Sequence, residues 1–73
     1  MSRNSINDIL NELECARNSH ENFNSRWEGF CVLQEEVHEL WEEVRKKEPP
    51  KKLMREEAVQ VAAMAIKFIE NCC

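Results

Sequence analysis

The chain has 73 residues, which allows one domain at most, and a chain this short usually needs disulfides, a structural metal or a partner chain for stability. Its net charge is −4, with 14 acidic and 10 basic residues and no basic stripe, which argues against duplex nucleic acid as a partner. The N-terminal stretch is polar without an apolar signal segment, and no run approaches the roughly 20 apolar residues of a membrane span, so we expect a soluble protein of the reducing cytoplasm.

One glycine, two prolines and the lack of strand-like alternation predict an all-α chain that forms a single domain over residues 1–73. The first helix is expected over about 6–18, with Ser5 as its N-cap, because apolar residues recur there at helical spacing. The polar residues 19–24 then link it to the second helix.

The second helix is expected over about 26–47. Ser25-Arg26-Trp27-Glu28 has the form of a capping box, in which the serine hydroxyl accepts from the third amide and the glutamate reaches back. Pro49 and Pro50 predict the end of this helix, because proline lacks the amide hydrogen and disfavours helical geometry in the residue before it. An apolar stripe flanked by Trp27 and Trp41 is expected to face the core: Phe30, Leu33, Val37, Leu40 and Val44.

The third helix, expected over about 52–71, is apolar on nearly all sides. At about 100° per residue, Leu53, Val61, Met64 and Phe68 lie on one side, and Val59, Ala62, Ile66 and Ile69 lie almost opposite. Two helices of the same chain can hardly cover both sides. We therefore predict that the three-helix chain assembles into a multi-chain helical bundle of at least two chains.

Four cysteines occur, at positions 15, 31, 72 and 73, and their spacing matches no zinc-binding pattern. We expect Cys15 and Cys31 to be small core residues rather than metal ligands.

Glutamates in the second and third helices are candidates for cation binding. Glu36, Glu39 and Glu43 fall within about 60° of one another, along one margin of the apolar stripe. Glu57 lies near the middle of an apolar face of the third helix, where a carboxylate is costly unless it is paired or binds a cation. Because no single basic residue is well placed to neutralise these acids, Mg²⁺ is a suitable counterion. Spaced acids also arise often by chance on acid-rich helices, so a solvated surface is the alternative.

Two motifs resemble those of a known family. Glu35-Glu36-Val37-His38-Glu39-Leu40 is similar to the E-E-x-x-E-L signature of the all-α nucleoside triphosphate pyrophosphohydrolases of MazG type. Glu57-Ala58-Val59-Gln60-Val61 falls where that group carries E-x-x-D-V. The resemblance extends over residues 20–72 and is strongest to a short MazG-like branch found in phage and mobile-element proteins.

This resemblance implies a magnesium-dependent enzyme that cleaves a nucleoside triphosphate into the monophosphate and pyrophosphate. Carried over by position, Glu36, Glu39 and Glu57 would be metal ligands, and Glu35 or Glu36 would act on the attacking water. Gln60 replaces the family's metal-binding aspartate; its amide oxygen can coordinate but brings no negative charge, so metal affinity should be lower.

Three further residues are candidates for contacting the substrate. Trp27 could stack on a base or pack in the protein, whereas core packing is favoured for Trp41. Lys67 could contact a phosphate and Asn71 continues the same polar edge, although lysines on such helices are usually solvated. His20 lies in the link, where nothing fixes it for proton transfer. The alternatives to an enzyme are a non-catalytic nucleotide-binding or protein-interaction module and a plain oligomerising bundle.

Overall fold

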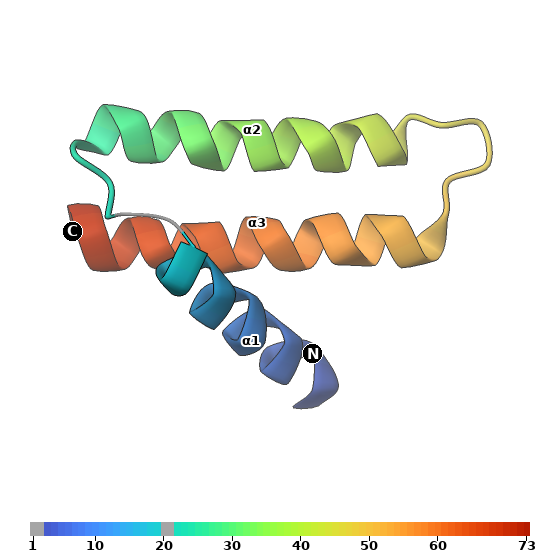
Figure 1. Ribbon diagram of the computed structural model, residues 1–73. Helices are drawn as coiled ribbons and strands as arrows, with labels where there is room; N and C mark the ends of the chain where they lie inside the picture. The colour runs from blue at the N-terminus through green and yellow to red at the C-terminus, as the bar shows by residue number, and fades with distance from the viewer. Residues whose placement is uncertain (1–2, 20–21) are drawn as a thin grey trace.

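The computed structural model describes residues 3–19 and 22–73, and the described chain forms three helices. These are α1 (Arg3–Ser19), α2 (Arg26–Val44) and α3 (Lys51–Cys72) (Figure 1). The all-α prediction is confirmed for these residues, among which no strand occurs. No helix in the described ranges is long and apolar enough to cross a bilayer. Residues 20 and 21, and with them His20 and part of the predicted link, lie outside the described residues.

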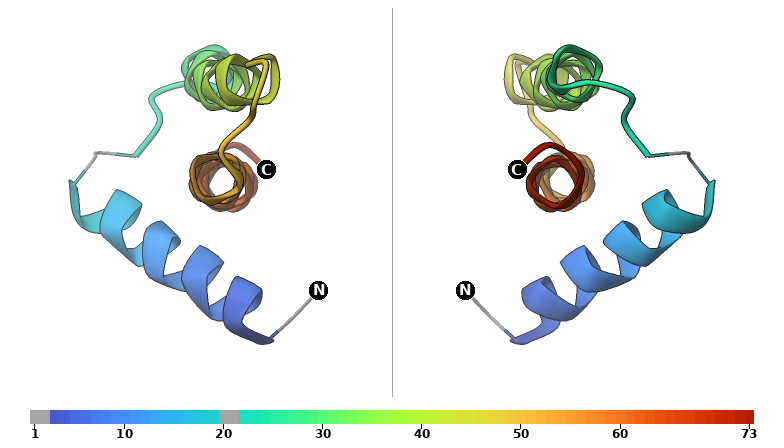
Figure 2. Two further views of the ribbon diagram at one scale, coloured as in Figure 1. Left: turned by 90° about the vertical axis from the view of Figure 1, so that its right-hand side faces the viewer. Right: turned by 90° about the vertical axis from the view of Figure 1, so that its left-hand side faces the viewer.

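α3 is the central helix of the fold. α2 and α3 run antiparallel, side by side along most of their length, and α1 packs across α3 at an angle (Figure 1). The end-on views of Figure 2 show that α1 and α2 approach α3 from different directions. Across the described ranges, α1 contacts α3 and makes no contact with α2 at the level of the helix backbones. In these ranges the two outer helices, α1 and α2, thus each pack on α3 without backbone contact to each other.

The start of α2 was predicted correctly from its capping residues. Ser25 is the N-cap, in extended geometry (φ −156°, ψ 164°), and its Oγ accepts a hydrogen bond from the Glu28 amide at 3.1 Å. The Glu28 carboxylate reaches one residue further back than in a capping box. It accepts from the backbone amide of Asn24 at 3.2 Å and from Asn24 Nδ2 at 3.3 Å. These bonds fix the residues before α2 as well as its first turn.

Of the other helix ends, those of α3 agree with the predictions, whereas the end of α2 and the start of α1 differ from them. α3 lies within one residue of its predicted bounds at each end. α2 stops at Val44 rather than Lys47: the Arg45 amide still donates to the carbonyl of Trp41, but the Lys46 amide donates to the carbonyl of Glu43, only three residues back, so the α-helical pattern ends there. Ser5 as the N-cap of the first helix is wrong: α1 already includes Arg3, and Ser5 lies inside it.

Gly29 allows α2 to approach α3 closely. A Cβ atom at this position would lie 2.9 Å from ring atoms of both Phe23 and Phe68 and 3.1 Å from Cys72 Sγ. Such distances are too short for carbon and sulfur atoms, so the missing side chain of glycine sets the spacing of the two helices. The same contacts bring the residues before α2 against the C-terminal end of α3.

The core of the single chain is small, and several residues predicted to be buried are exposed. The buried apolar residues are Leu13, Ala16, Ala63 and Met64. In the predicted stripe of α2, Leu33 and Leu40 are half-buried, but Phe30, Val37 and Val44 are exposed, and so is Trp41 at 55%. The reason is a rotation: the face turned to α3 carries Gly29, Glu36 and Leu40, so the rest of the stripe, Phe30, Val37 and Val44, lies to one side of the contact.

The core prediction for Cys15 and Cys31 is wrong. Both thiols are exposed in the single chain. Cys15 lines hollows at the side of α1 and does not lie where α1 contacts α3. Cys31 lies on the part of α2 that is turned away from α3. Helical spacing alone did not distinguish these positions from buried ones.

Candidate functional site

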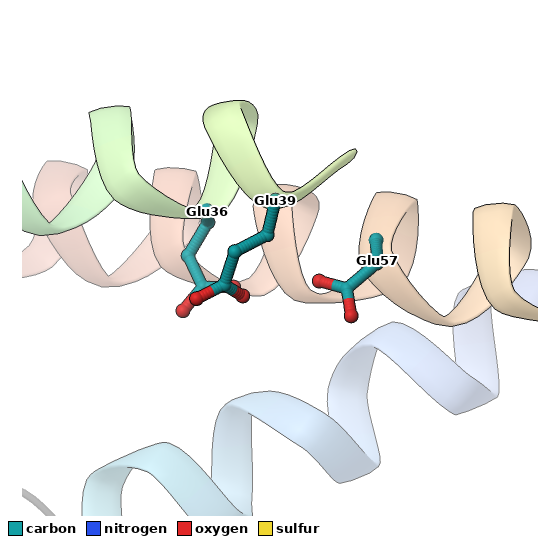
Figure 3. Close-up of side chains that lie close together, drawn as sticks. All are labelled: Glu36, Glu39 and Glu57. Atoms are coloured by element: carbon teal, nitrogen blue, oxygen red, sulfur yellow. The ribbon is translucent and has the colours of Figure 1, made fainter. Parts of the chain in front are cut away.

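Three carboxylates from two helices meet at one point. Glu36 and Glu39 lie one turn apart on α2, and Glu57 lies on the neighbouring part of α3. One carboxylate oxygen from each residue lies within 4.8 Å of the other two. Figure 3 shows the side chains of Glu36 and Glu39 directed to the same place, with Glu57 turned toward them and α1 passing on the same side. The convergence predicted from the spacing is thus present, and the role of these residues as ligands stays a prediction.

The environment of Glu36 and Glu57 disfavours the charged form of their carboxylates. Burial raises the pKa of Glu36 to about 7, and the nearby charges of Glu39 and Glu57 add to the rise. Burial also raises the pKa of Glu57, again with a contribution from Glu39. When ionised, carboxylates only accept hydrogen bonds, and the buried Oε2 atoms of Glu36 and Glu57 have no donor among the described residues.

These features fit a hard divalent cation. The cluster offers oxygen atoms alone, which Mg²⁺ prefers, and the two buried oxygens without a donor are ones that a cation would satisfy. Glu43, on the same margin of α2, lies outside this group of three, and its carboxylate is paired with the ammonium group of Lys46. Glu36, Glu39 and Glu57 are therefore the residues that could hold a metal.

A groove between α1 and α2 contains Glu36 and Gln60. It has a volume of about 230 Å³ and is lined by Glu12, Cys15, Ala16 and Ser19 of α1, Glu36 of α2, and Gln60 and Met64 of α3. Gln60 thus shares a cavity with Glu36, as expected for a weak additional ligand. Glu12 was missed at the sequence level, although its charge also raises the pKa of Glu36. Nothing in the sequence signals this, because the placement of α1 depends on tertiary packing.

Lys67 lies beneath an adjoining hollow of about 500 Å³. The lining of that hollow includes Glu35, Glu36 and Met64, so it continues the groove just described. Lys67 is only 1% exposed, and its Nζ lies 4.6 Å from the centroid of the Phe23 ring, in cation–π geometry. The expectation that a lysine on this helix is solvated is therefore wrong. A buried positive charge lies near carboxylates that the sequence analysis assigned to the site.

Asn71 and Trp27 occupy different surroundings. The Oδ1 atom of Asn71 accepts a hydrogen bond from the Phe23 amide at 2.9 Å, so Asn71 anchors the residues before α2 to the end of α3. This bond places the Phe23 ring against Lys67. Trp27 is 68% exposed, with the Arg26 guanidinium 4.9 Å from its ring centroid, and it lines neither hollow. The structure thus brings Lys67 to the groove and leaves Trp27 outside it.

No protein-family model, curated protein or solved structure matches this chain. The geometry of the described residues is therefore what bears on function.

Proposed function

We propose that this protein is a magnesium-dependent, MazG-like nucleotide pyrophosphohydrolase, which cleaves a nucleoside triphosphate into the monophosphate and pyrophosphate. The observation that carries the proposal is the meeting of Glu36, Glu39 and Glu57 within 4.8 Å, beside a hollow that is lined by Glu36 and by the buried Lys67. An acidic group that binds a cation beside a basic group that binds phosphate is the arrangement that phosphoryl chemistry uses.

Each residue near the groove has a role in this proposal. Glu36, Glu39 and Glu57 would hold Mg²⁺, with the amide oxygen of Gln60 as a weaker neutral ligand. Bound there, the cation would supply charge neutralisation for the phosphates. Glu35 lines the hollow next to Glu36, within reach of a water molecule to be oriented for attack. Lys67, in the same hollow, would contact a phosphate oxygen.

The proposal includes self-association, as a homodimer or a dimer of dimers. Large apolar side chains are about half exposed on the face of α2 that is turned away from the groove: Phe30 at 53%, Val37 at 48%, Trp41 at 55% and Val44 at 45%. On α3, Ile69 is 60% exposed. Burying a fully exposed side chain of this size contributes roughly 1.5–3 kcal/mol, and these side chains are already about half buried, so each would add about half of that when a second copy covers this face.

The test is a pyrophosphate-release assay across the common nucleoside and deoxynucleoside triphosphates, with and without Mg²⁺. We expect release that requires Mg²⁺ and that falls at least about 100-fold in Glu36→Gln and in Glu57→Gln, since each removes a charged ligand. Glu48→Gln is the matched control, because Glu48 is an exposed acid in the connection between α2 and α3. This variant should keep its activity.

A second measurement separates the enzyme from a non-catalytic module. Mg²⁺ bound by the folded chain must raise the midpoint of thermal unfolding, and Glu36→Gln should abolish this rise. A rise without turnover would favour a nucleotide-binding module. The absence of both turnover and a rise in the unfolding midpoint would contradict the metal site and leave only a self-associating bundle.

A further inference from the structure

α1 is attached to the rest of the molecule along a narrow line. Among its apolar side chains, Leu13 and Ala16 are buried, whereas Ile6 is 47% and Leu10 53% exposed. Hollows of about 450 Å³ and 260 Å³, both reached by Arg55 and Val59 of α3, flank the line of contact. Apart from Leu13 and Ala16 the sides of α1 are therefore open, and an element with exposed apolar side chains and open flanks separates more easily than one packed on all sides.

Two groups of ionic contacts hold α1 on α3. Near the start of α1, Arg55 donates to Asp8 at 2.8 Å and to Ser5 Oγ at 3.3 Å. Near its end, Arg17 Nε donates to Glu70 Oε1 at 3.2 Å. The four charged side chains are between 36% and 47% exposed, so solvent and salt screen both pairs. The docking of α1 should therefore weaken as the ionic strength rises.

The pairing of α2 with α3 does not involve α1. Within the described residues, no backbone contact joins α1 to α2, and the close packing at Gly29 lies between α2, Phe23 and α3. α2 and α3 can thus stay paired while α1 moves.

We propose that α1 acts as a strap: it docks on and releases from the paired α2 and α3 as a unit, and its release opens the groove that contains Glu36 and Gln60. Four of the seven residues that line this groove, Glu12, Cys15, Ala16 and Ser19, belong to α1. Release removes that wall and exposes Glu36 and Met64 to solvent. A released helix of 17 residues is only marginally stable by itself, so its amide hydrogens then exchange with water.

Hydrogen exchange of the whole chain, followed by mass spectrometry of fragments from each helix, tests the strap. Arg55→Gln and Arg17→Gln each remove one ionic contact between α1 and α3, and each should speed exchange in α1 about two- to fivefold. Exchange in the paired parts of α2 and α3 should change little. Raising the salt concentration should also speed exchange in α1 of the unaltered chain.

Arg45→Gln is the matched control, since it removes an equally exposed ion pair, with Glu42 at 3.5 Å, that lies wholly at the end of α2. It should leave exchange in α1 unchanged. Asp8→Asn breaks the Arg55 contact from the other side and serves as a second variant if Arg55→Gln folds poorly.

The strap is refuted if amides of α1 and α3 exchange at the same rate and respond equally to denaturant, because α1 then opens only when the whole chain unfolds. It is equally refuted if Arg45→Gln speeds exchange in α1 as much as Arg55→Gln does. The experiment uses neither metal nor nucleotide, so its outcome is independent of the hydrolase proposal.

Discussion

Glu36 combines three properties that seldom occur together in a surface helix. Its side chain is partly buried, one of its oxygens lacks a donor among the described residues, and two other carboxylates lie within 4.8 Å. Each property destabilises the charged form, and a bound cation would relieve all three. The same residue therefore links the stability of the fold to pH, and under the proposed metal site it would also link stability to divalent ions.

In the absence of divalent cations, we predict that the stability of the chain depends on pH through Glu36. The pKa of Glu36 is about 7 in the folded chain against an ordinary 4.5, so the folded state binds more protons than the unfolded state between these values. The contribution of Glu36 to the free energy of unfolding is then highest below about pH 4.5 and falls as the pH rises through 7. After allowance for solvent screening we expect a loss on the order of 1 kcal/mol, measured as the pH dependence of thermal unfolding.

Glu36→Gln should remove most of this pH dependence and stabilise the chain near neutral pH, whereas Glu48→Gln should leave the profile as it is. A profile that rises between pH 5 and 7 in the unaltered chain would show that Glu36 is not held in a destabilising environment.

At the scale of helices, the contact of α2 with α3 depends on one residue without a side chain. The Cβ atom of an alanine at position 29 would come within 3.1 Å of two aromatic rings and a thiol, so these groups or the helices would have to move. We predict that Gly29→Ala destabilises the chain by about 1–3 kcal/mol, although alanine favours the helix itself by up to roughly 1 kcal/mol. The measurement is the free energy of unfolding in urea.

The matched control is Gln34→Ala, on the exposed side of α2, which changes helix propensity without adding an atom to the contact. This variant should be neutral or slightly stabilising. If Gly29→Ala were as stable as Gln34→Ala, the spacing of α2 and α3 would not be limited at Gly29.

For the whole molecule, the exposed apolar face predicts self-association. We expect the chain to sediment as a dimer or a larger assembly, and Val37→Glu to weaken the association at least about tenfold, since it places a charge among apolar contacts. Gln34→Glu adds the same charge beside this face and should have little effect. A chain that remains monomeric at high concentration would contradict the prediction.

Local rules were sufficient for the predictions that held. The start of α2 depends on Ser25 and Glu28, which act within one turn, and both bonds of the cap are present in nearly the expected form. The bounds of α3 follow from Pro50 and from a long apolar run with good helix formers. Spacing was also sufficient to place Glu36 and Glu39 on one face of the second helix, and the resemblance added Glu57, whose carboxylate meets theirs in the structure.

Most of the predictions that failed depended on which side of a helix meets its neighbour; the exceptions are Ser5 as an N-cap and Lys47 as the end of α2, which concern helix ends. Cys15, Cys31 and Trp41 lie at positions that periodicity could assign to a core, yet all three are exposed. Lys67 is the reverse case, a charged residue that the packing of three helices buries. The position of Glu12 in the same groove as Glu36 was missed for the same reason, because it depends on where α1 crosses α3.

The sequence by itself thus determined that the chain is helical, where its helices begin and end to within a few residues, and which acids share a face. Caps, prolines and helical periodicity act over a few residues, so the sequence carries them directly. Only the tertiary structure decided which face of α2 meets α3, that Lys67 is buried and that α1 completes the groove. These features depend on contacts between residues far apart in the chain, where close packing, as at Gly29, selects one rotation of a helix over others with similar apolar content.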